Sequence, residues 1–507
     1  MRHVLLALIA FCSAWGSHAQ TFSNRYDLQG FADVTVERYN GLPGGGGLIA
    51  SIRQDNALVV TRVAPDGGVA WSTGCQLSIS AQDWYGVYDM GQLADGGFYV
   101  LGSIIQSFNY AWALLRFDAT GEVIWGRKLG FDLNRIGFEY DKTSKVVQRA
   151  DGNLVVMIAG AQRFALVGLD LVDANLLFSK SYSAVDDSTY LKNPGFDMTT
   201  TDDGGVIVCG KDRDWPFLLR ADAMGQTVWA KRYPGIPSTY THWRNMARLS
   251  NGDLLIAGFS AESGGCIWRL NGNGTIQWMK SLIGTLYFRE MADLGNGEFA
   301  VTDETNRVIR FNENGEVLNT LEFNSSEGTF FMNFLGGSGS DLELASTFVP
   351  NSGTQLLPIV LRMPESGMLA CSANTYEVLA TDVPGVSGYS GTSAVVQFDE
   401  ACEVTDMPIT SDHPAWVVSD VCQLLVGIDE GAVEAVRVSP TLLNAGTPIT
   451  ISGVEPSVDH MLIASDGRIA RSGVGSSVNT IGLAPGLYSL RVNDGSSIVL
   501  VARVVFQ

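Results

Sequence analysis

The chain has 507 residues, of which 46% are hydrophobic and 17% are charged, and its formal net charge is −20. The apolar content is too high for a disordered chain and the length exceeds that of one average domain, so we expect at least two globular units. The acidic balance would repel phosphate groups, which excludes a nucleic-acid partner held by electrostatic attraction.

Residues 1–19 have the pattern of a secretory signal peptide. Arg2 and His3 precede an apolar run from Val4 to Cys12, and Ser17-His18-Ala19 places small residues at the cleavage positions. The mature chain would then begin at Gln20. The apolar run is shorter than the ~20 residues that span a bilayer core, so we expect a secreted or outer-membrane surface protein with no transmembrane anchor.

A Gly-centred turn followed by an apolar run recurs along most of the chain. The turns lie about 42 to 56 residues apart and are centred on Gly46, Gly96, Gly152, Gly204, Gly252, Gly297 and Gly339. A period of this length is typical of propellers and solenoids, and the short, β-rich runs argue against helical repeats.

Each repeat contains four short apolar runs joined by tight turns, which predicts a four-stranded antiparallel sheet. The second turn of the repeat recurs at Gly67, Gly121, Gly225, Gly274, Gly315 and Gly367. The strand after it carries Trp71, Trp125, Trp229 and Trp278, with Phe178 in the third repeat and the aliphatic residues Leu318 and Leu369 in the last two. We expect these tryptophans to pack between neighbouring sheets.

The second strand of each repeat, such as Phe98 to Leu101, is apolar without alternation, so both of its faces should be buried. Sheets stacked radially meet this requirement, whereas a two-sheet sandwich leaves one face of each strand in water. The sequence therefore predicts an all-β, seven-bladed β-propeller over residues 20–374. We expect its first inner strand within residues 20–40 and ring closure near residues 25–40 and 358–374.

The second repeat, with Asp-Gly-Gly-Phe-Tyr-Val-Leu-Gly from Asp95 and Leu-Arg-Phe-Asp-Ala-Thr-Gly-Glu-Val-Ile-Trp from Leu115, resembles the secreted propeller repeats of Bacteroidetes surface proteins. It is also similar to the tryptophan-docking motif of quinoprotein propellers. The segment from Asp118 to Gly121 is one residue shorter than that motif, and the chain has no adjacent cysteine pair. A structural role for the tryptophan is therefore favoured over a quinoprotein dehydrogenase.

Two segments follow the repeats. Residues 375–432 are rich in Gly, Ser, Thr and Asp and are expected to form a linker or a small β-module. Residues 433–507 show a new all-β pattern that includes Pro440, Gly446, Asp466-Gly467-Arg468 and the run Leu-Ala-Pro-Gly-Leu-Tyr from Leu483 to Tyr488.

This last pattern resembles the type A C-terminal sorting domain of the Bacteroidetes type IX secretion system. The resemblance implies a small immunoglobulin-like β-sandwich, export through Sec and then the type IX machinery, and removal of the domain or its exchange for a surface anchor. The alternative is an immunoglobulin-like adhesion domain that stays in the mature protein.

Loss of Cys12 with the signal peptide would leave Cys75, Cys209, Cys266, Cys371, Cys402 and Cys422. An even number of cysteines in an exported chain favours disulfides, with at least one pair expected among Cys371, Cys402 and Cys422. Inert buried thiols are the alternative. The absence of C-x-x-C spacing argues against a zinc ribbon or a redox motif.

Motifs for catalysis or cofactor binding are lacking in the sequence. His242, His413 and His460 have no metal-ligand spacing to other ligands, and neither a G-x-S-x-G turn nor a Walker loop occurs. We therefore expect no catalytic residue, no metal and no cofactor. Converging carboxylates in a propeller channel, as in a glycosidase or lyase, stay open as an alternative.

We expect a ligand to bind on the face formed by the loops between second and third strands and by the links between blades, since variable loops on a rigid scaffold commonly carry binding residues. The candidate ligand-binding residues are Trp84, Tyr110, Arg135, Asp212, Arg213, Trp215, Tyr240, His242, Trp243 and Arg244. The alternative is that these side chains only cover the ends of the blades. The sequence thus favours a non-enzymatic binding or adhesion module for a glycan or surface protein, with a carbohydrate-active enzyme as the alternative.

Overall fold

The structure is a computed structural model of the whole chain. It describes residues 22–28, 34–77, 82–106, 109–131, 144–160, 163–184, 195–212, 215–233, 241–283, 285, 287–323, 328–338, 341–350, 357–363, 373–375, 379–384, 388, 392–393, 395–399, 402–420, 437–439, 442–443, 448–452, 459–464, 468–484, 486–493 and 498–506. The chain divides into two compact units, residues 1–420 and 421–507. The predicted signal peptide lies outside the described residues.

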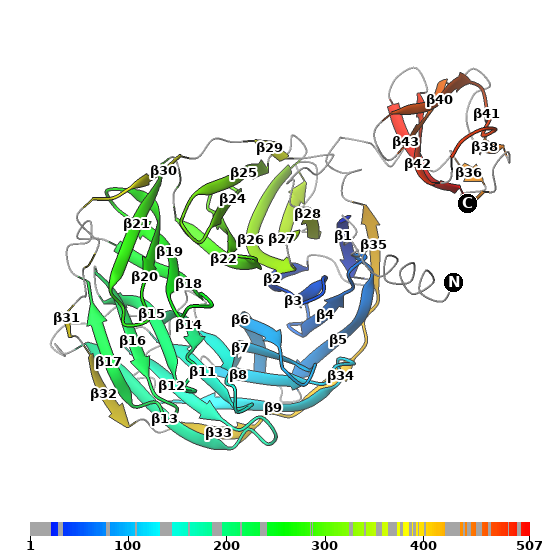
Figure 1. The fold of residues 1–507 in the computed structure, drawn as a ribbon. Coiled ribbons are helices and arrows are strands. Elements are labelled where there is room, and N and C mark those ends of the chain that lie inside the picture. The colour runs from blue at the N-terminus through cyan, green and yellow to red at the C-terminus, as the bar shows by residue number, and fades with distance from the viewer. Residues whose placement is uncertain are drawn as a thin grey trace, which may run out of the picture. The chain divides into compact units, whose positions relative to one another are not determined.

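The first unit contains seven antiparallel sheets arranged radially around a central axis, as Figure 1 shows. This arrangement confirms the predicted seven-bladed propeller.

In blades 1 to 6, four strands run outward from the centre in chain order. Blade 1 contains β2 (Thr35–Gly41), β3 (Gly47–Ile52), β4 (Leu58–Val63) and β5 (Val69–Leu77). Blade 2 contains β6 (Gln82–Gln92), β7 (Phe98–Gln106), β8 (Asn109–Phe117) and β9 (Val123–Gly130). Blade 3 contains β10 (Lys145–Gln148), β11 (Leu154–Ala159), β12 (Phe164–Leu169) and β13 (Leu176–Ala184).

The second half of the ring repeats this order. Blade 4 contains β14 (Gly195–Thr200), β15 (Val206–Asp212), β16 (Trp215–Ala221) and β17 (Thr227–Arg232). Blade 5 contains β18 (Thr241–Arg248), β19 (Leu254–Ser260), β20 (Gly264–Leu270) and β21 (Ile276–Ile283). Blade 6 contains β22 (Phe288–Gly295), β23 (Glu298–Asp303), β24 (Arg307–Asn312) and β25 (Val317–Phe323). Blade 7 contains β26 (Gly328–Ser338), β27 (Asp341–Pro350), β28 (Leu357–Met363) and, from the other end of the chain, β1 (Phe22–Leu28).

The ring is closed by β1, which pairs antiparallel with β28 from Phe22 opposite Arg362 to Arg25 opposite Ile359. The N-terminal segment therefore supplies the fourth strand of blade 7, and the first inner strand of blade 1 is β2. The sequence analysis instead placed a turn at Gly367 and the strand residue Leu369 in that fourth position. Both residues lie outside the described part of the chain, and β1 holds the position, because closure with a strand from the opposite terminus ties the two ends of the ring together.

Residues 373–420, which we call the belt, return around the outside of the ring. Seven short strands each add a fifth antiparallel strand to one blade, in the order blade 6 to blade 1 and then blade 7. They are β29 (Ala373–Thr375), β30 (Leu379–Asp382), β31 (Thr392–Ser393), β32 (Val395–Asp399), β33 (Glu403–Asp406), β34 (Ile409–Asp412) and β35 (Trp416–Asp420). Figure 1 shows them at the periphery of the ring. Most of the stretch expected as a linker or small β-module therefore completes the blades.

Aromatic side chains of the fourth strands pack against turns of the next blade. A Cβ atom at Gly121 would lie 2.6 Å from the Trp71 ring, and one at Gly315 would lie 2.8 Å from the Trp278 ring. These turn glycines also have positive φ, so the turn and the indole both require glycine there. The packing role predicted for the tryptophans holds at these two positions.

Side-chain hydroxyl groups also bind the turns between third and fourth strands, each from the preceding blade. Tyr26 donates a hydrogen bond to the carbonyl oxygen of Gly67 at 2.8 Å, and Thr73 donates one to that of Gly121 at 2.8 Å. Tyr233 donates a hydrogen bond to the carbonyl oxygen of Gly274 at 2.5 Å. Each bond satisfies a buried acceptor at a blade interface, which fixes the relative position of the two sheets.

The second unit has two sheets. The three-stranded sheet contains β36 (Arg437–Ser439), β38 (Ile449–Ser452) and β41 (Ser477–Val478). The five-stranded sheet contains β37 (Leu442–Leu443), β43 (Ile498–Phe506), β42 (Gly486–Asn493), β39 (Asp459–Ala464) and β40 (Ile469–Val474). Tyr488, from the run that resembles the sorting-domain motif, donates a hydrogen bond to the carbonyl oxygen of Ala484 at 2.9 Å. This bond links the start of β42 to the preceding turn.

Cys75, Cys209 and Cys266 are buried thiols of the propeller strands. Burial raises the pKa of Cys75 to about 12, which keeps its thiol protonated and unreactive. Cys371 and Cys422 lie outside the described residues, so the disulfide expected among Cys371, Cys402 and Cys422 stays a prediction. Among the residues that the structure places, none belongs to a helix long and apolar enough to cross a bilayer.

Candidate functional site

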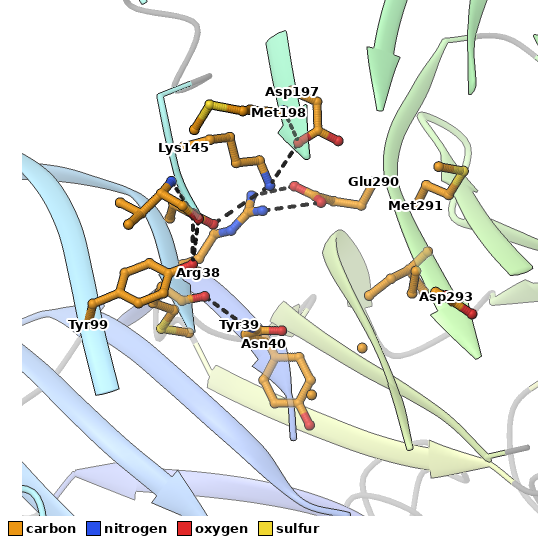
Figure 2. Close-up of a pocket in the computed structure, with 17 residues that line it drawn as sticks. Arg38, Tyr39, Asn40, Tyr99, Lys145, Asp197, Met198, Glu290, Met291 and Asp293 are labelled. Carbon is orange, nitrogen blue, oxygen red and sulfur yellow. Dashed lines mark hydrogen bonds and ion pairs between the residues drawn. The ribbon is translucent and has the colours of Figure 1, made fainter. Parts of the chain in front are cut away.

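A cavity of about 310 Å³ lies at the centre of the ring, between the innermost strands. Its charged lining residues come from five elements: Arg38 on β2, Asp89 on β6, Lys145 on β10, Asp197 on β14, and Glu290 with Asp293 on β22. Figure 2 shows Arg38, Lys145, Asp197 and Glu290 converging from different blades. Residues more than 250 positions apart in the sequence therefore share one site.

Five of these residues occupy the same position in successive blades. Asp89, Lys145, Asp197 and Glu290 each lie seven residues before the repeated turn glycine. Arg38 lies seven residues before Gly45, whose amide closes the corresponding turn of blade 1 as that of Gly96 does in blade 2. The strand pairing agrees, since Arg38 is opposite Ala50, Lys145 opposite Met157 and Glu290 opposite Thr302 on the second strand of each blade. Asn245 holds this position in blade 5. We call these six residues the channel ring.

The channel ring is joined by ion pairs of alternating sign. Arg38 binds Glu290 through both terminal nitrogens of its guanidinium group, Nη1 to Oε1 and Nη2 to Oε2, the second at 3.3 Å. Lys145 lies between two carboxylates, with Nζ 3.6 Å from Asp89 and 3.7 Å from Asp197. Figure 2 shows Lys145 beside Asp197. The ring thus holds three carboxylates and two cations in a small, largely buried space.

The aspartates also hold the backbone of the next blade. Asp89 accepts a hydrogen bond from the backbone amide of Val146 at 2.8 Å, and Asp197 accepts one from that of Met246 at 2.7 Å. Asn245 donates a weak hydrogen bond of 3.5 Å to the carbonyl oxygen of Arg289. These bonds satisfy the free edges of innermost strands, which have no further strand beside them.

The environment of the channel ring shifts the pKa of its members. Burial raises the pKa of Asp197, although Lys145 and the amides of Met246 and Met198 partly offset this effect. Burial alone would lower the pKa of Lys145, but the carboxylates of Asp89 and Asp197 together raise it. Lys145 is therefore charged at neutral pH, and Asp197 gains a proton more easily than an exposed aspartate.

This arrangement can bind small polar groups by hydrogen bonding and can hold a proton on Asp197. Over the described residues, no group of three or more His, Cys, Asp and Glu side chains is placed to hold a metal ion. Lys145 itself occupies the space between Asp89 and Asp197 where a cation would be attracted.

The structure corrects the exposure expected for two candidate ligand-binding residues. Trp84 is 3% exposed and Trp243 is 0% exposed, and both belong to apolar clusters between blades. The register of the inner strand shifts between Trp84 and Gly86 and again between Trp243 and Asn245. Such shifts change the face that a side chain takes, so these indoles support the core rather than a surface.

Other predicted residues do gather at the expected face, where first strands begin and second strands end. Arg244 lies 5.9 Å from the ring centre of Phe196, and His242 lies 6.4 Å from Phe196 and 6.4 Å from Tyr287. Tyr287 stacks on Phe259 at 3.9 Å. We call these five residues the aromatic–basic cluster, which spans blades 4 to 6.

Two further aromatic residues lie at the same ends of their strands. Trp215 begins β16, and the Arg232 guanidinium lies 4.9 Å from its ring centre. Tyr110 of blade 2 packs edge-on against Tyr85 at 5.4 Å. Asp212 ends β15, and its side chain is not described. Arg135, Arg213 and Tyr240 lie outside the described residues.

Burial lowers the pKa of His242 to about 3, and the positive charges of Lys211 and Arg244 add to this effect. His242 is therefore neutral in the folded protein at physiological pH. A neutral imidazole beside aromatic rings and a guanidinium suits stacking and hydrogen bonding to a ligand, rather than proton transfer at neutral pH.

The channel ring was not predicted from the sequence, because each member looks like an ordinary strand residue. The signal that could have found it is its constant distance from the repeated glycines, together with alternating charge in blades 1 to 4. A charged residue at one fixed position of an inner strand points toward the axis that all blades share.

No protein-family model and no curated protein matches this sequence. Solved structures do match. The C-terminal WD40 domain of Sif2 aligns with 10% identity and a TM-score of 0.42, over 67% of this chain and 98% of that domain. PorZ, a surface component of the type IX secretion system of Porphyromonas gingivalis, aligns with 13% identity and a TM-score of 0.38, over 91% of this chain and 64% of PorZ. A protein of unknown function from Bacteroides caccae aligns with 13% identity and a TM-score of 0.32, over 59% of this chain and 93% of that protein.

Proposed function

We propose that this protein is an exported surface protein whose propeller binds a glycan or a protein without chemical change. The observation that carries the proposal is the aromatic–basic cluster together with Trp215 and Arg232, on the face built from links and second-to-third loops. Aromatic faces stack on sugar rings or on apolar side chains, while the guanidinium groups beside them donate hydrogen bonds.

Export is the second part of the proposal. It is supported by the pattern of residues 1–19 and by the resemblance of residues 433–507 to a type IX sorting domain. In this proposal the C-terminal unit is a small immunoglobulin-like β-sandwich that contacts the type IX machinery and is then removed or exchanged for a surface anchor.

Binding is tested with the mature chain on arrays of glycans and of surface proteins, followed by titration of the best ligand. Trp215→Ala and Arg244→Ala should weaken binding by about 1–2 kcal/mol each, as expected for aromatic and arginine anchors. Met224→Ala is the matched control, because Met224 is an exposed apolar residue of a turn at the other end of blade 4. Equal affinity of all four proteins would contradict the proposed binding face.

Export is tested by deleting residues 433–507 in a host that has a type IX system. The truncated protein should accumulate in the periplasm with the propeller folded, as judged by protease resistance. Normal delivery to the cell surface would contradict the sorting role.

A carbohydrate-active enzyme is the second candidate, and the channel ring favours it. Asp89, Asp197 and Glu290 converge on one cavity, and a raised pKa such as that of Asp197 is what a general acid requires. We place it second because these carboxylates are engaged by Arg38, Lys145 and backbone amides. New reducing ends released from polysaccharides by the wild type but not by Asp197→Asn would favour the enzyme.

A further inference from the structure

The belt is attached to the outer edge of the blades through short, separate strand pairings. It follows the ring in one direction, and each belt strand pairs with only one other strand, the fourth strand of its blade. The pairings are short, from two residues at β31 to five residues at β32 and β35. The four-stranded blade beneath each of them is complete without it.

Apolar side chains hold the belt at intervals. Met407 is 6% exposed and packs in the apolar cluster between blades 1 and 2, with Ile409 beside it. Val404 packs against the cluster between blades 2 and 3, and Val383 against that between blades 4 and 5. Each anchor belongs to one stretch of the belt, so the contacts are separate rather than one continuous core.

Charge sets the register of the belt. Its 48 residues include eight Asp and Glu and no Lys or Arg, while blades 2, 3 and 5 present a basic residue on the fourth strand. Asp406 lies directly opposite Arg127, Asp399 opposite Lys180, and Asp382 opposite Lys280, and each of these pairs forms an ion pair. Opposite charges at facing positions favour one register over a slipped one.

The end of the belt is also the start of the link to the C-terminal unit. β35 ends at Asp420, opposite Asn24 of β1, and the chain then continues to residues 421–507. A force applied beyond Asp420 would act first on β35. It would reach β34 only after β35 has detached, because each strand is held by its own blade.

We propose that the belt is an extensible tether, which detaches from the ring blade by blade from β35 to β29 while the seven blades stay folded. Fully extended, its 48 residues would span at most about 160 Å, at ~3.4 Å per residue. The biological meaning of such a tether rests on the proposed surface attachment through the C-terminal region. The mechanical behaviour of the belt is independent of that attachment, because it depends only on the pairing of the belt strands with the ring.

The experiment is single-molecule stretching of the mature chain between a tag inserted beside the exposed turn residue Ser250 and a tag at the C-terminus. The expected record shows release of up to about 160 Å in several steps before any step from the blades. The C-terminal unit of 87 residues, 421–507, gives a separate and larger step. In the reference arrangement, with tags at Ser250 and at the N-terminus, the force bypasses the belt and this release should be absent.

Variants separate the tether from general weakening of the propeller. Asp399→Asn combined with Asp406→Asn removes two ion pairs and should lower the force of the belt release. Glu403→Gln, an exposed belt residue opposite Gly130, is the matched control and should leave that force unchanged. Hydrogen exchange without force gives an independent measure: amides of residues 373–420 should exchange faster in the double variant, while those of β7, β11 and β15 keep their protection.

Simultaneous loss of belt and blades in a single step would overturn the proposal, as would unfolding of blades before the belt. Equal effects of the double variant and of Glu403→Gln would overturn the role of the ion pairs. Failure of the glycan and protein arrays to give a ligand would instead count against the proposed function and would leave the stretching result for the belt unchanged.

Discussion

The innermost and outermost strands of the propeller both carry charged residues at a repeated position in several blades, but in opposite surroundings. In the channel ring, the side chains of Asp89, Asp197 and Glu290 are 8–15% exposed. In the belt, those of Asp382, Asp399 and Asp406 are 82–88% exposed. The same repeat can therefore place charge where water is nearly excluded or where water screens it, and the energy of each pair follows from the surroundings.

The largest difference is expected when one lysine partner of the carboxylates is removed from each region. Lys145→Met leaves Asp89 and Asp197 in a buried site without their cation and should lower the free energy of unfolding by about 3 kcal/mol. Lys280→Met removes the partner of the exposed Asp382 and should cost less than about 1 kcal/mol. The measurement is urea unfolding at neutral pH, and equal losses would contradict the distinction between the two regions.

A second test uses pH, because among the described residues of the two regions Asp197 is the carboxyl group whose pKa is raised by burial. The raised pKa of Asp197 means that its contribution to stability is fully present below its unfolded pKa of about 4 and is lost as pH rises through the folded value. The stability advantage of the wild type over Asp197→Asn should therefore be smaller at pH 7 than at pH 4. Urea unfolding of both proteins at the two pH values measures this difference, and a larger advantage at pH 7 would contradict it.

The architecture of the ring could be predicted because it depends on local features that repeat. Turn glycines such as Gly121 and aromatic residues such as Trp71 recur at similar spacing along the chain. The aromatic residue of one blade packs against the turn glycine of the next, as Trp71 does against Gly121. Seven copies of a weak signal identify the blades. The strand that closes blade 7 could not be assigned in this way, because β1 lies before the first repeat.

The belt strands could not be predicted from the sequence, because strands of two to five residues are too short to show a pattern of alternation. Their pairing is determined by the ring, which lies hundreds of residues away in the sequence. One signal was present: no Lys or Arg occurs between Arg362 and Arg437. An acidic stretch of that length beside blades with basic fourth strands indicates electrostatic complementarity, which a linker does not need.

Only part of the candidate site could be predicted from the sequence, because local pattern identifies loops but not shifts in strand pairing. The loop-rich face was predicted from the position of variable segments, and His242, Arg244 and Trp215 lie there. Trp84 and Trp243 differ because the register of the inner strand shifts just after each of them, and such a shift has no sequence signature of its own. The same shifts precede Asp89, Asn245 and Glu290, so they help to turn the channel ring toward the axis.

The exposed region is tested with the belt acids. Asp399→Asn and Asp406→Asn should each lower the free energy of unfolding by about 0.5 kcal/mol at low salt, since exposed ion pairs contribute little. In 1 M salt, where the screening length is about 3 Å, the loss should nearly vanish. The cost of Lys145→Met should persist in 1 M salt, because its partners are largely shielded from solvent. Urea unfolding in both salts measures this contrast, and a salt-insensitive loss for the belt variants would contradict it.

The smallest effect is expected where the belt lacks an ion pair. Lys231 of blade 4 is opposite Ser393, and its ammonium group donates a hydrogen bond to the carbonyl oxygen of Asn273 at 2.5 Å. Ser393→Asp would place a carboxylate opposite Lys231, as Asp399 lies opposite Lys180 in blade 3, and should stabilise the belt by a few tenths of a kcal/mol. Hydrogen exchange of residues 392–399 should slow at low salt and return to the wild-type rate in 1 M salt. Ser393→Asn is the control, because it supplies a side chain of similar size without charge. Equal slowing by Asn would show that hydrogen bonding rather than charge holds this part of the belt, and the electrostatic account of the outer region would then fail at blade 4.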